Sequence, residues 1–293
     1  MRVLLIKGLL HLFASLPLRT AHGIATLLGR IIAQRTTLRI AQVTRTNIRL
    51  CFPHLPVAEQ NVLAKQSLIE TCKTFSEMGA LWLWPPKRML GLVRKVSGEA
   101  YLQQALQRGK GGLVLTPHLA SWEIVGLYVC SRYPSTALSR PLKLAGLHDL
   151  IYTARSRTGG RIVPTDNAGV RALYRALHQN ELAGILPDQV PNEGMGIFAP
   201  FFGIPTYTIV LASRLARKTG ASVIFAYAER LPHSQGFHLH FFQAPAEIAA
   251  ENLEIAASAL NQAIEQCIQQ YPTQYQWSYK RFKRRPAGEV SVY

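Results

Sequence analysis

The feature that most constrains the fold of this chain is a series of short apolar segments between residues 113 and 242. Each segment ends at a polar or helix-breaking residue, and helical patterns separate most of them. The segments have the length of buried strands, which we expect at 113–116, 136–139, 161–164, 182–186, 222–228 and 237–242. Strands that alternate with helices are typical of an α/β sheet covered by helices. The sequence therefore predicts the α/β class, with a mixed, mostly parallel sheet flanked by helices.

Helical spacing of apolar residues accounts for most of the remaining chain. We expect helices at 57–84, 99–108, from 121 onward, and at 147–157, 170–180, 208–219 and 249–270, with a loop rich in glycine and proline over 187–203. No internal repeat or low-complexity linker divides these elements. The sequence therefore predicts one catalytic domain, residues 46–293, behind an N-terminal segment, residues 1–45.

The N-terminal segment is basic and apolar, and no acidic residue precedes Glu59. Its apolar runs, 8–18 and 20–29, are interrupted by Pro17 and Arg19, whereas a spanning helix needs about 20 apolar residues in sequence. The pattern favours a basic amphipathic helical segment that anchors the chain in a membrane interface. A single imperfect transmembrane pass and an ordinary buried helix pair remain as alternatives.

The charge of the chain indicates an anionic partner. There are 33 lysines and arginines against 16 acidic residues, a net charge of +17, which suits nucleic acid, an anionic bilayer or an acidic protein. The bases gather in the apolar N-terminal segment and in the C-terminal tail, rather than in a stripe interleaved with aromatic residues, so nucleic acid is disfavoured. The four cysteines lie far apart and no nucleotide-binding glycine pattern is present, so we expect no metal and no cofactor.

Three of the predicted strands end in polar residues: His118, Arg140 and Asp188. Reactive groups of open α/β sheets gather beyond the carboxyl ends of the strands. We therefore expect the active site at this edge of the sheet.

His118 is followed five residues later by Glu123, in the sequence PHLASWE. The two can meet only if His118 lies in the turn and Glu123 in the first turn of the next helix, because residues five apart diverge on a regular helix. The carboxylate would then fix the imidazole tautomer and leave the other nitrogen as a general base. His54 and Glu59 have the same spacing, but no strand precedes them. From the residues alone, a strand-end histidine satisfied by hydrogen bonds remains an equal alternative.

A histidine–carboxylate pair without an adjacent nucleophile suggests deprotonation of a substrate hydroxyl, because Ser121 is too close in sequence to complete an obvious triad. Acyl transfer also requires a group that stabilises the developing oxyanion. The candidates are Arg140, Arg155, Arg157 and the backbone amides near Gly159.

Several segments of the chain resemble the lipid A biosynthesis late (lauroyl/myristoyl) acyltransferases of the lysophospholipid acyltransferase superfamily. The matching blocks are NIRLCFP (47–53), GKGGLVLTPHLASWE (109–123), SRP (139–141), RSRTG (155–159), PDQ (187–189), PFFG (200–203) and QYQWSYKRFKRRP (274–286). The last block is the most specific of them, and the resemblance is nearly full length.

The resemblance implies transfer of a fatty acyl chain from acyl carrier protein to a hydroxyl of an acyl chain on a lipid A precursor, in lipopolysaccharide biosynthesis. It implies that His118 abstracts the proton, that Glu123 orients His118, and that Arg157 or Arg140 stabilises the oxyanion. The residues that it implies for substrate binding are Trp122, Arg155, Asp188, Gln189, Phe202, Gly203, Trp277 and Arg281. The expected location is the bacterial inner membrane, with the catalytic domain on the cytoplasmic face. A glycerophospholipid or another glycolipid is the alternative acceptor.

Overall fold

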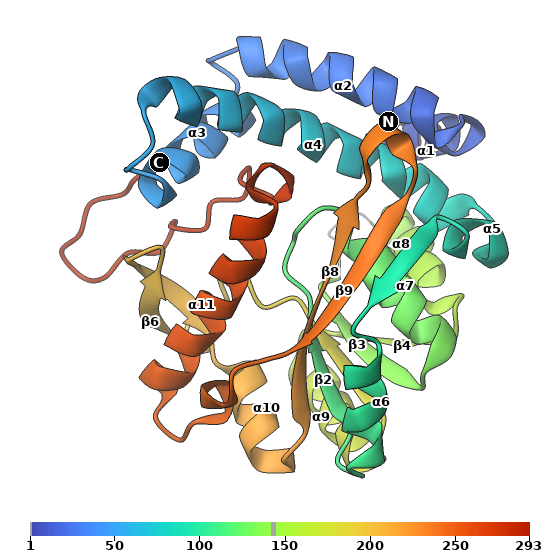
Figure 1. The fold of residues 1–293 in the computed structure, drawn as a ribbon, viewed down its shortest axis with the longest axis vertical. Coiled ribbons are helices and arrows are strands. Elements are labelled where there is room, and N and C mark those ends of the chain that lie inside the picture. The colour runs from blue at the N-terminus through green and yellow to red at the C-terminus, as the bar shows by residue number, and fades with distance from the viewer. Residues whose placement is uncertain (1, 142–144) are drawn as a thin grey trace.

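A seven-stranded sheet forms the centre of the computed structural model, which describes residues 2–141 and 145–293 (Figure 1). Its strands are β1 (Val93–Ser97), β2 (Gly112–Leu115), β3 (Ser135–Ser139), β4 (Arg161–Pro164), β5 (Leu182–Ile185), β8 (Ser222–Arg230) and β9 (Phe237–Gln243). They lie in the order β1-β9-β8-β2-β5-β3-β4. Only β8 and β9 pair antiparallel among these strands, and the other neighbours are parallel. The predicted mixed, mostly parallel sheet is confirmed.

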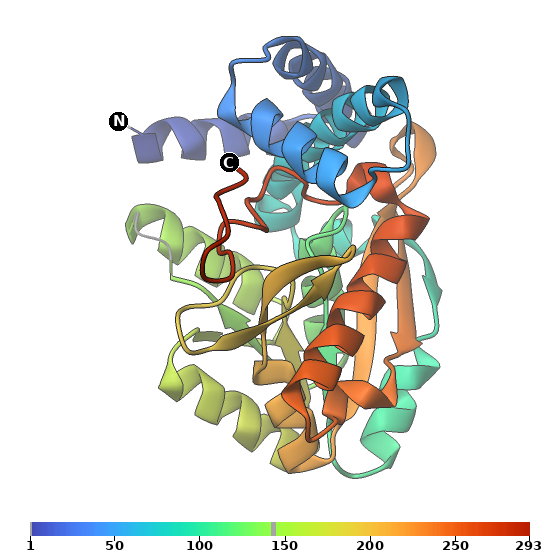
Figure 2. The same cartoon turned by 90° about the vertical axis from the view of Figure 1, so that its left-hand side faces the viewer.

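Helices cover both faces of this sheet, and the N-terminal helices gather across one end of it (Figures 1 and 2). The helices are α1 (Arg2–Ser15), α2 (Leu18–Gln34), α3 (Arg39–Cys51), α4 (Val57–Leu83), α5 (Pro86–Leu90), α6 (Ala100–Gln107), α7 (Trp122–Arg132), α8 (Ala145–Ser156), α9 (Asn167–His178), α10 (Leu211–Thr219) and α11 (Leu253–Gln270). Three short 3-10 helices are η1 (Pro232–Ser234), η2 (Ala246–Ala249) and η3 (Pro272–Gln274).

The central strand β2 is buried on both faces because its side chains alternate between two apolar cores. Leu113 and Leu115 pack with residues of α9, α10 and α11. Val114 packs on the opposite face with residues of α6 and α7. A strand buried in this way reads as a continuous apolar run, which explains why the short segment 113–116 could be recognised in the sequence.

A second, two-stranded sheet begins within the region predicted as a loop over 187–203 and continues beyond it. Strands β6 (Gly196–Phe201) and β7 (Ile204–Ile209) pair antiparallel, with Pro200 opposite Pro205. Proline cannot donate a ladder hydrogen bond, so its presence argued against strands, but a small sheet with free edges tolerates it. The prediction of a helix from residue 208 was wrong by three residues, because residues 208 and 209 belong to β7 and α10 begins at Leu211.

Strand β1 was also absent from the prediction. It forms the edge of the large sheet, and its central residues Arg94 and Lys95 are exposed. A charged edge strand lacks the apolar run by which the buried strands were recognised, and such charges protect an edge from pairing with another chain.

The N-terminal helices pack against α4 with close backbone approaches. A side chain at Gly29 of α2 would collide with Ile69, and one at Gly79 of α4 would collide with the backbone of α1 at Leu10. Helix α3 runs across the predicted boundary between residues 45 and 46. Among the helices that the structure describes, none has the length and apolar character needed to cross a membrane.

The faces of α1 and α2 that do not contact the protein carry exposed apolar side chains. They are Leu4, Leu5, Leu9 and Leu12 of α1, and Ile24, Leu27, Leu28 and Ile31 of α2. The spacing of three and four residues places each set on one side of its helix. Helices α1 and α2 therefore pack against the protein on one side and expose apolar side chains on the other.

Candidate active site

His118 lies in the turn that follows β2, where residues of β5 can reach it because β5 is the parallel neighbour of β2. Its backbone nitrogen donates to Oδ2 of Asp188 at 2.8 Å. Its ring nitrogen Nδ1 lies 2.7 Å from Oδ1 of the same carboxylate. Asp188 follows β5, so two of the three predicted polar strand ends are in direct contact.

Asp188 is buried beneath the imidazole. Burial alone would raise the pKa of its carboxyl group, but the charge and the two hydrogen bonds of His118 lower that pKa below its ordinary value. The ionised carboxylate of Asp188 accepts a hydrogen bond from the protonated Nδ1 of His118. Nε2 is then the unprotonated, basic nitrogen of the ring. Nε2 of His118 lies 3.2 Å from the side-chain nitrogen of Gln189, whose N–H can donate to it.

Glu123 occupies the first turn of α7, as predicted, but its hydrogen bonds go elsewhere. Arg155 of α8 donates to both of its carboxylate oxygens, with Nε 3.0 Å from Oε2, and Trp82 Nε1 donates to Oε2 at 3.2 Å. Burial would raise the pKa of Glu123, and Arg155 outweighs that effect and lowers it. Among the described residues no hydrogen bond joins Glu123 to His118. The contact expected from Glu123 is made by Asp188.

A cavity of about 600 Å³ lies beside His118, under α7 and α8 and against β3, β4 and β5. Its lining includes both ends of β3, Ser135 and Ser139, and both ends of β5, Leu182 and Ile185. It therefore extends along the full length of β3, about 13 Å at the usual rise per residue. Apolar side chains form most of the wall, while the charged and amide groups lie at the carboxyl ends of the strands.

The three candidate arginines occupy different positions. Arg140 lines the cavity, is exposed, and donates from Nη2 to Asn192 Oδ1 at 3.2 Å. Arg155 also lines the cavity, but it is bound to Glu123 and, through Nη1, to Ser139 Oγ at 2.6 Å. Arg157 donates to the carbonyl of Leu81 in α4, and burial lowers its pKa. Within the described part of the chain, Arg157 lies outside the lining of the cavity.

The residues implied for substrate binding divide into two groups. Trp122, Arg155 and Gln189 line the cavity, with the Trp122 ring 4.9 Å from that of His118, and Asp188 lies directly behind His118. Four others are outside the cavity lining: Phe202, Gly203, Trp277 and Arg281.

These four residues have structural contacts instead. Phe202 and Gly203, with φ of 49° and 74°, form the turn between β6 and β7. Trp277 is buried and donates from Nε1 to Pro272 O at 2.7 Å. Arg281 is buried and donates from Nη1 to Tyr207 O at 2.8 Å. A sequence block can match a family because it packs, as well as because it binds substrate.

The turn that carries His118 is supported by the C-terminal segment. The backbone nitrogen of Gln276 donates to the His118 carbonyl at 3.0 Å, and that of Ala120 donates to the Gln274 carbonyl at 2.8 Å. Ala120 has a positive φ of 49°, which costs free energy for a residue other than glycine. Tertiary contacts hold this strained turn, since Thr74 Oγ1 of α4 also donates to the Ala120 carbonyl at 3.2 Å.

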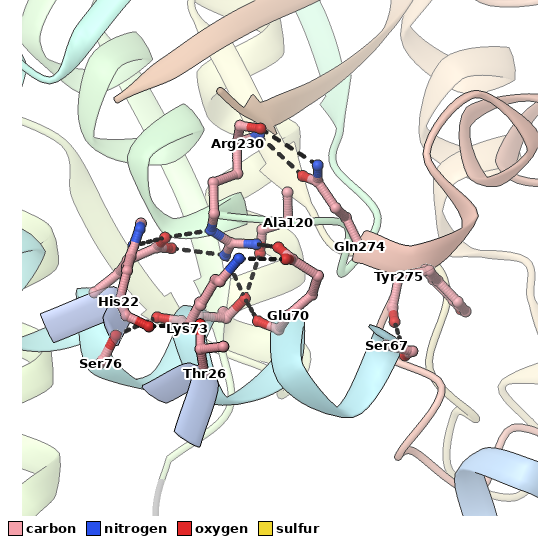
Figure 3. A network of polar contacts seen from close by, with 12 residues as sticks. His22, Thr26, Ser67, Glu70, Lys73, Ser76, Ala120, Arg230, Gln274 and Tyr275 are labelled. Carbon is pink, nitrogen blue, oxygen red and sulfur yellow. Dashed lines mark hydrogen bonds and ion pairs between the residues drawn. The ribbon is translucent and has the colours of Figure 1, made fainter. Parts of the chain in front are cut away.

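A buried ionic network joins α2, α4 and β8 behind this turn (Figure 3). Arg230 donates to the carboxylates of Glu70 and Glu77, and His22 Nε2 lies 2.8 Å from Glu77 Oε1. The backbone nitrogen of Arg230 donates to Gln274 Oε1 at 2.9 Å. This network was not predicted from the sequence. The signal available was Glu77, the one charged residue in the mostly apolar stretch 74–84.

His54, which shares the spacing of His118, is exposed and lies after α3. The centroid of its ring lies 6.1 Å from that of the Phe52 ring. His118 therefore follows a strand and lines the cavity, whereas His54 follows a helix and is exposed, as their sequence contexts predicted.

Comparison with known proteins identifies the family. The sequence profile described as bacterial lipid A biosynthesis acyltransferase matches residues 2–284. The chain is 25% identical to the lipid A biosynthesis lauroyltransferase of Escherichia coli over 287 residues, covering 98% of this chain and 92% of that protein. It is 28% identical to the lipid A biosynthesis palmitoleoyltransferase of the same organism over 290 residues, with the same coverage of 98% and 92%. A lipid A biosynthesis acyltransferase of Haemophilus influenzae is 28% identical over 251 residues, 85% of this chain and 79% of that protein. The chain therefore belongs to the bacterial lipid A biosynthesis acyltransferase family, and it is an acyltransferase.

Proposed function

We propose that this enzyme transfers a fatty acyl chain from acyl carrier protein to a hydroxyl group of an acyl chain on a lipid A precursor, with His118 as the general base. The observation that carries the proposal is the position of His118 beside a long apolar cavity, with Asp188 bound to its Nδ1. This arrangement offers a basic nitrogen to one reactant and an apolar channel to the other.

In the proposed reaction, Nε2 of His118 takes the proton of the acceptor hydroxyl while the hydroxyl oxygen attacks the thioester carbonyl of the donor. Buried, ionised Asp188 stabilises the imidazolium that results. Collapse of the tetrahedral intermediate forms the new ester and expels the thiolate, which takes the proton back from His118. Gln189 would yield its position at Nε2 to the acceptor hydroxyl.

Arg140 is the arginine best placed to stabilise the oxyanion, since it lines the cavity at the end of β3 and, within residues 2–141 and 145–293, its side chain donates to a neutral amide, Asn192. Arg157 is a weaker candidate because its guanidinium is directed to the Leu81 carbonyl. Glu123 and Arg155 form an ion pair in the cavity wall, and we propose that this pair positions α7 and α8 around the reacting groups.

The acyl carrier protein donor and the membrane location are supported by charge and by the N-terminal helices. Acyl carrier protein is acidic and a lipid A precursor carries phosphates, so the net charge of +17 favours both. The exposed apolar faces of α1 and α2 would lie in the bilayer interface, with their arginines near anionic headgroups. We place the catalytic domain on the cytoplasmic face of the inner membrane.

The test is turnover of purified enzyme with acylated acyl carrier protein and a lipid A precursor. His118→Ala is expected to lower the rate by about 10²–10⁴-fold, the usual contribution of a general base. His54→Ala, the matched control, should retain normal turnover because His54 is exposed and follows no strand. Normal turnover by a folded His118→Ala protein would disprove the assignment.

The acceptor is tested separately by mass spectrometry of lipids from a deletion strain. Loss of one acyl chain from lipid A, restored by the wild-type gene and by His54→Ala but not by His118→Ala, supports the proposal. If lipid A is unchanged and a glycerophospholipid or another glycolipid is altered instead, that lipid is the acceptor, and the protein is still an acyltransferase.

A further inference from the structure

Three side chains with metal-binding atoms meet on the antiparallel pair β8–β9. Glu229 of β8 is directly opposite His238 of β9, and His240 lies two residues further along the same strand. Side chains two residues apart in a strand point to the same face, and directly opposed side chains of an antiparallel pair also share a face. The sheet therefore brings one carboxylate and two imidazoles together.

The distances between these groups suit a single ion. Oε2 of Glu229 lies 3.0 Å from Nε2 of His240 and 3.4 Å from Nδ1 of His238. One donor atom from each residue can be chosen so that all three lie within 4.8 Å of one another. In a tetrahedral zinc site with bonds of about 2.0–2.2 Å, the donor atoms are separated by roughly 3.3–3.6 Å. Small side-chain movements would thus bring all three donors onto one cation.

Neighbouring residues hold the three donors in place. Ser97 Oγ of β1 lies 2.8 Å from the second nitrogen of His238, Nε2. The ring of His240 stacks on Tyr227 with 4.7 Å between centroids, and the Tyr271 ring lies beside both, with centroids 5.8 Å from that of Tyr227 and 6.1 Å from that of His240. Metal-binding histidines characteristically use their second nitrogen in such a hydrogen bond, which fixes the orientation of the ring.

The cluster is also accessible. The side chains of Glu229, His238 and His240 retain 19%, 11% and 21% of their exposure, so an ion can enter and complete its coordination with water. Two imidazoles and one carboxylate form a donor set that zinc and other divalent first-row metals bind, with zinc well suited to a flexible tetrahedral arrangement.

We propose that Glu229, His238 and His240 form a binding site for a divalent first-row cation, zinc being the best fit, distinct from the acyl-transfer site. The ion would join β8 to β9 at the place where Tyr271 connects this pair to the C-terminal segment. That segment contacts the His118 turn through Gln274 and Gln276. The proposed role of the ion is structural, and its ligands do not touch the His118–Asp188 pair.

The test is cobalt(II) titration of untagged full-length protein after treatment with a chelator, followed by zinc competition. We expect one equivalent of cobalt to produce visible absorption bands of a low-coordinate site, and zinc to abolish them. Excess zinc should also raise the thermal midpoint of unfolding by several degrees, since a ligand that binds only the folded state stabilises it. Absence of these bands together with no shift in the midpoint would overturn the proposal.

Variants locate the site. His240→Ala and Glu229→Gln are each expected to weaken cobalt binding at least about tenfold, since ligand removal should cost no less than loss of a second hydrogen-bonding partner. Glu229→Gln preserves the shape of the side chain, so circular dichroism can verify the fold before the titration. The matched control is His233→Asn, in the exposed turn between β8 and β9, which should bind cobalt normally. Cobalt binding unchanged in Glu229→Gln and His240→Ala would place the ion elsewhere and refute the site.

Discussion

His118 has two carboxylates associated with it, and they differ in how they contact the imidazole. Glu123 is five residues away in sequence but is bound by Arg155 and Trp82. Asp188 is 70 residues away and contacts both the ring and the backbone nitrogen of His118. At the scale of single residues, the hydrogen bonds therefore favour Asp188 as the group that orients the imidazole of His118, and they place Glu123 in the cavity wall.

Substitution of the two carboxylates should separate these roles. Asp188→Asn is expected to lower kcat by about 10²–10⁴-fold, because a neutral amide cannot stabilise the imidazolium. Glu123→Gln should instead lower the thermal midpoint of unfolding, since it leaves Arg155 partly buried without its carboxylate. Steady-state kinetics and calorimetry of both variants measure these effects. A larger loss of kcat in Glu123→Gln than in Asp188→Asn would restore Glu123 as the orienting residue.

Helix α7 carries Gly126 on the same face as Trp122, four residues away, and both line the cavity. A Cβ atom at Gly126 would meet no other heavy atom within 4 Å. A larger side chain at this position can therefore extend into the cavity without a backbone clash.

At the scale of this element, we expect Gly126→Met to shorten the acyl chain that the enzyme transfers, because the added side chain occupies space along the cavity. Competition between acylated carrier proteins of different chain length measures the preference. Gly23→Met, a matched change in α2 where a Cβ also meets no atom within 4 Å, should leave the preference unchanged. An identical preference in Gly126→Met and wild type would show that the acyl chain does not pass α7.

The network of Arg230, Glu70, Glu77 and His22 fixes α2, α4 and β8 relative to one another (Figure 3). Burial would raise the pKa of Glu77, but Arg230 and then His22 outweigh it and lower that pKa from 4.5 to about 2. A carboxyl group with a lowered pKa in the folded state stabilises the fold above its unfolded pKa, and this contribution is lost as the pH falls toward the folded value.

We therefore expect Glu77→Gln to reduce the free energy of unfolding at pH 7 by about 3 kcal/mol, the size of the linkage between these two pKa values. The difference from wild type should narrow as the pH is lowered from 5 to 3, because wild type progressively loses the same contribution. Chemical denaturation across this range measures the difference. The control is Glu59→Gln, at an exposed position on the same helix, for which the difference in unfolding free energy from wild type should not change with pH. A difference for Glu77→Gln that stays constant between pH 5 and 3 would contradict the ionised state of the buried carboxylate.

The sequence predicted the elements that are defined by local pattern. Strand β2 and the turn at His118 could be recognised because a fully apolar run ends abruptly at Thr116 and Pro117. Strand β1 and the β6–β7 hairpin could not, because charged edge residues and prolines remove that signal. Predicted site residues that follow strand ends, His118, Arg140 and Gln189, line the cavity.

Partners across the sheet could not be predicted, because pairing depends on strand order. Asp188 reaches His118 only because β5 is the neighbour of β2, and sequence spacing instead suggested Glu123. Trp277 and Arg281, which were assigned to substrate binding, are buried. Their burial could not be predicted, because the basic and aromatic residues of the tail do not indicate that it packs into the interior. The cluster of Glu229 with His238 and His240 likewise depends on the register of β8 and β9.

At the scale of the whole molecule, the apolar faces of α1 and α2 lie at the end of the sheet that also carries α4 and the His118 turn. An acceptor held in a membrane would approach this end. The orientation that buries the exposed leucines would therefore also present the active-site edge of the sheet to the lipid surface.

This arrangement makes a prediction about membrane binding. Leu27 and Leu28 of α2 are 60% and 46% exposed, and burial of a leucine side chain contributes about 1.5–3 kcal/mol. Replacing both with serine should therefore weaken binding to vesicles that contain anionic lipid by on the order of 100-fold, as measured by flotation. The control is Val62→Ser together with Val290→Ser, which are also exposed, at 60% and 84%, but belong to α4 and to the C-terminal segment. If the two double variants float equally, the N-terminal helices are not the membrane-binding surface. If only the leucine variant fails to float, and its turnover with a detergent-dispersed acceptor is normal, then α2 binds the membrane and is not required for the reaction itself.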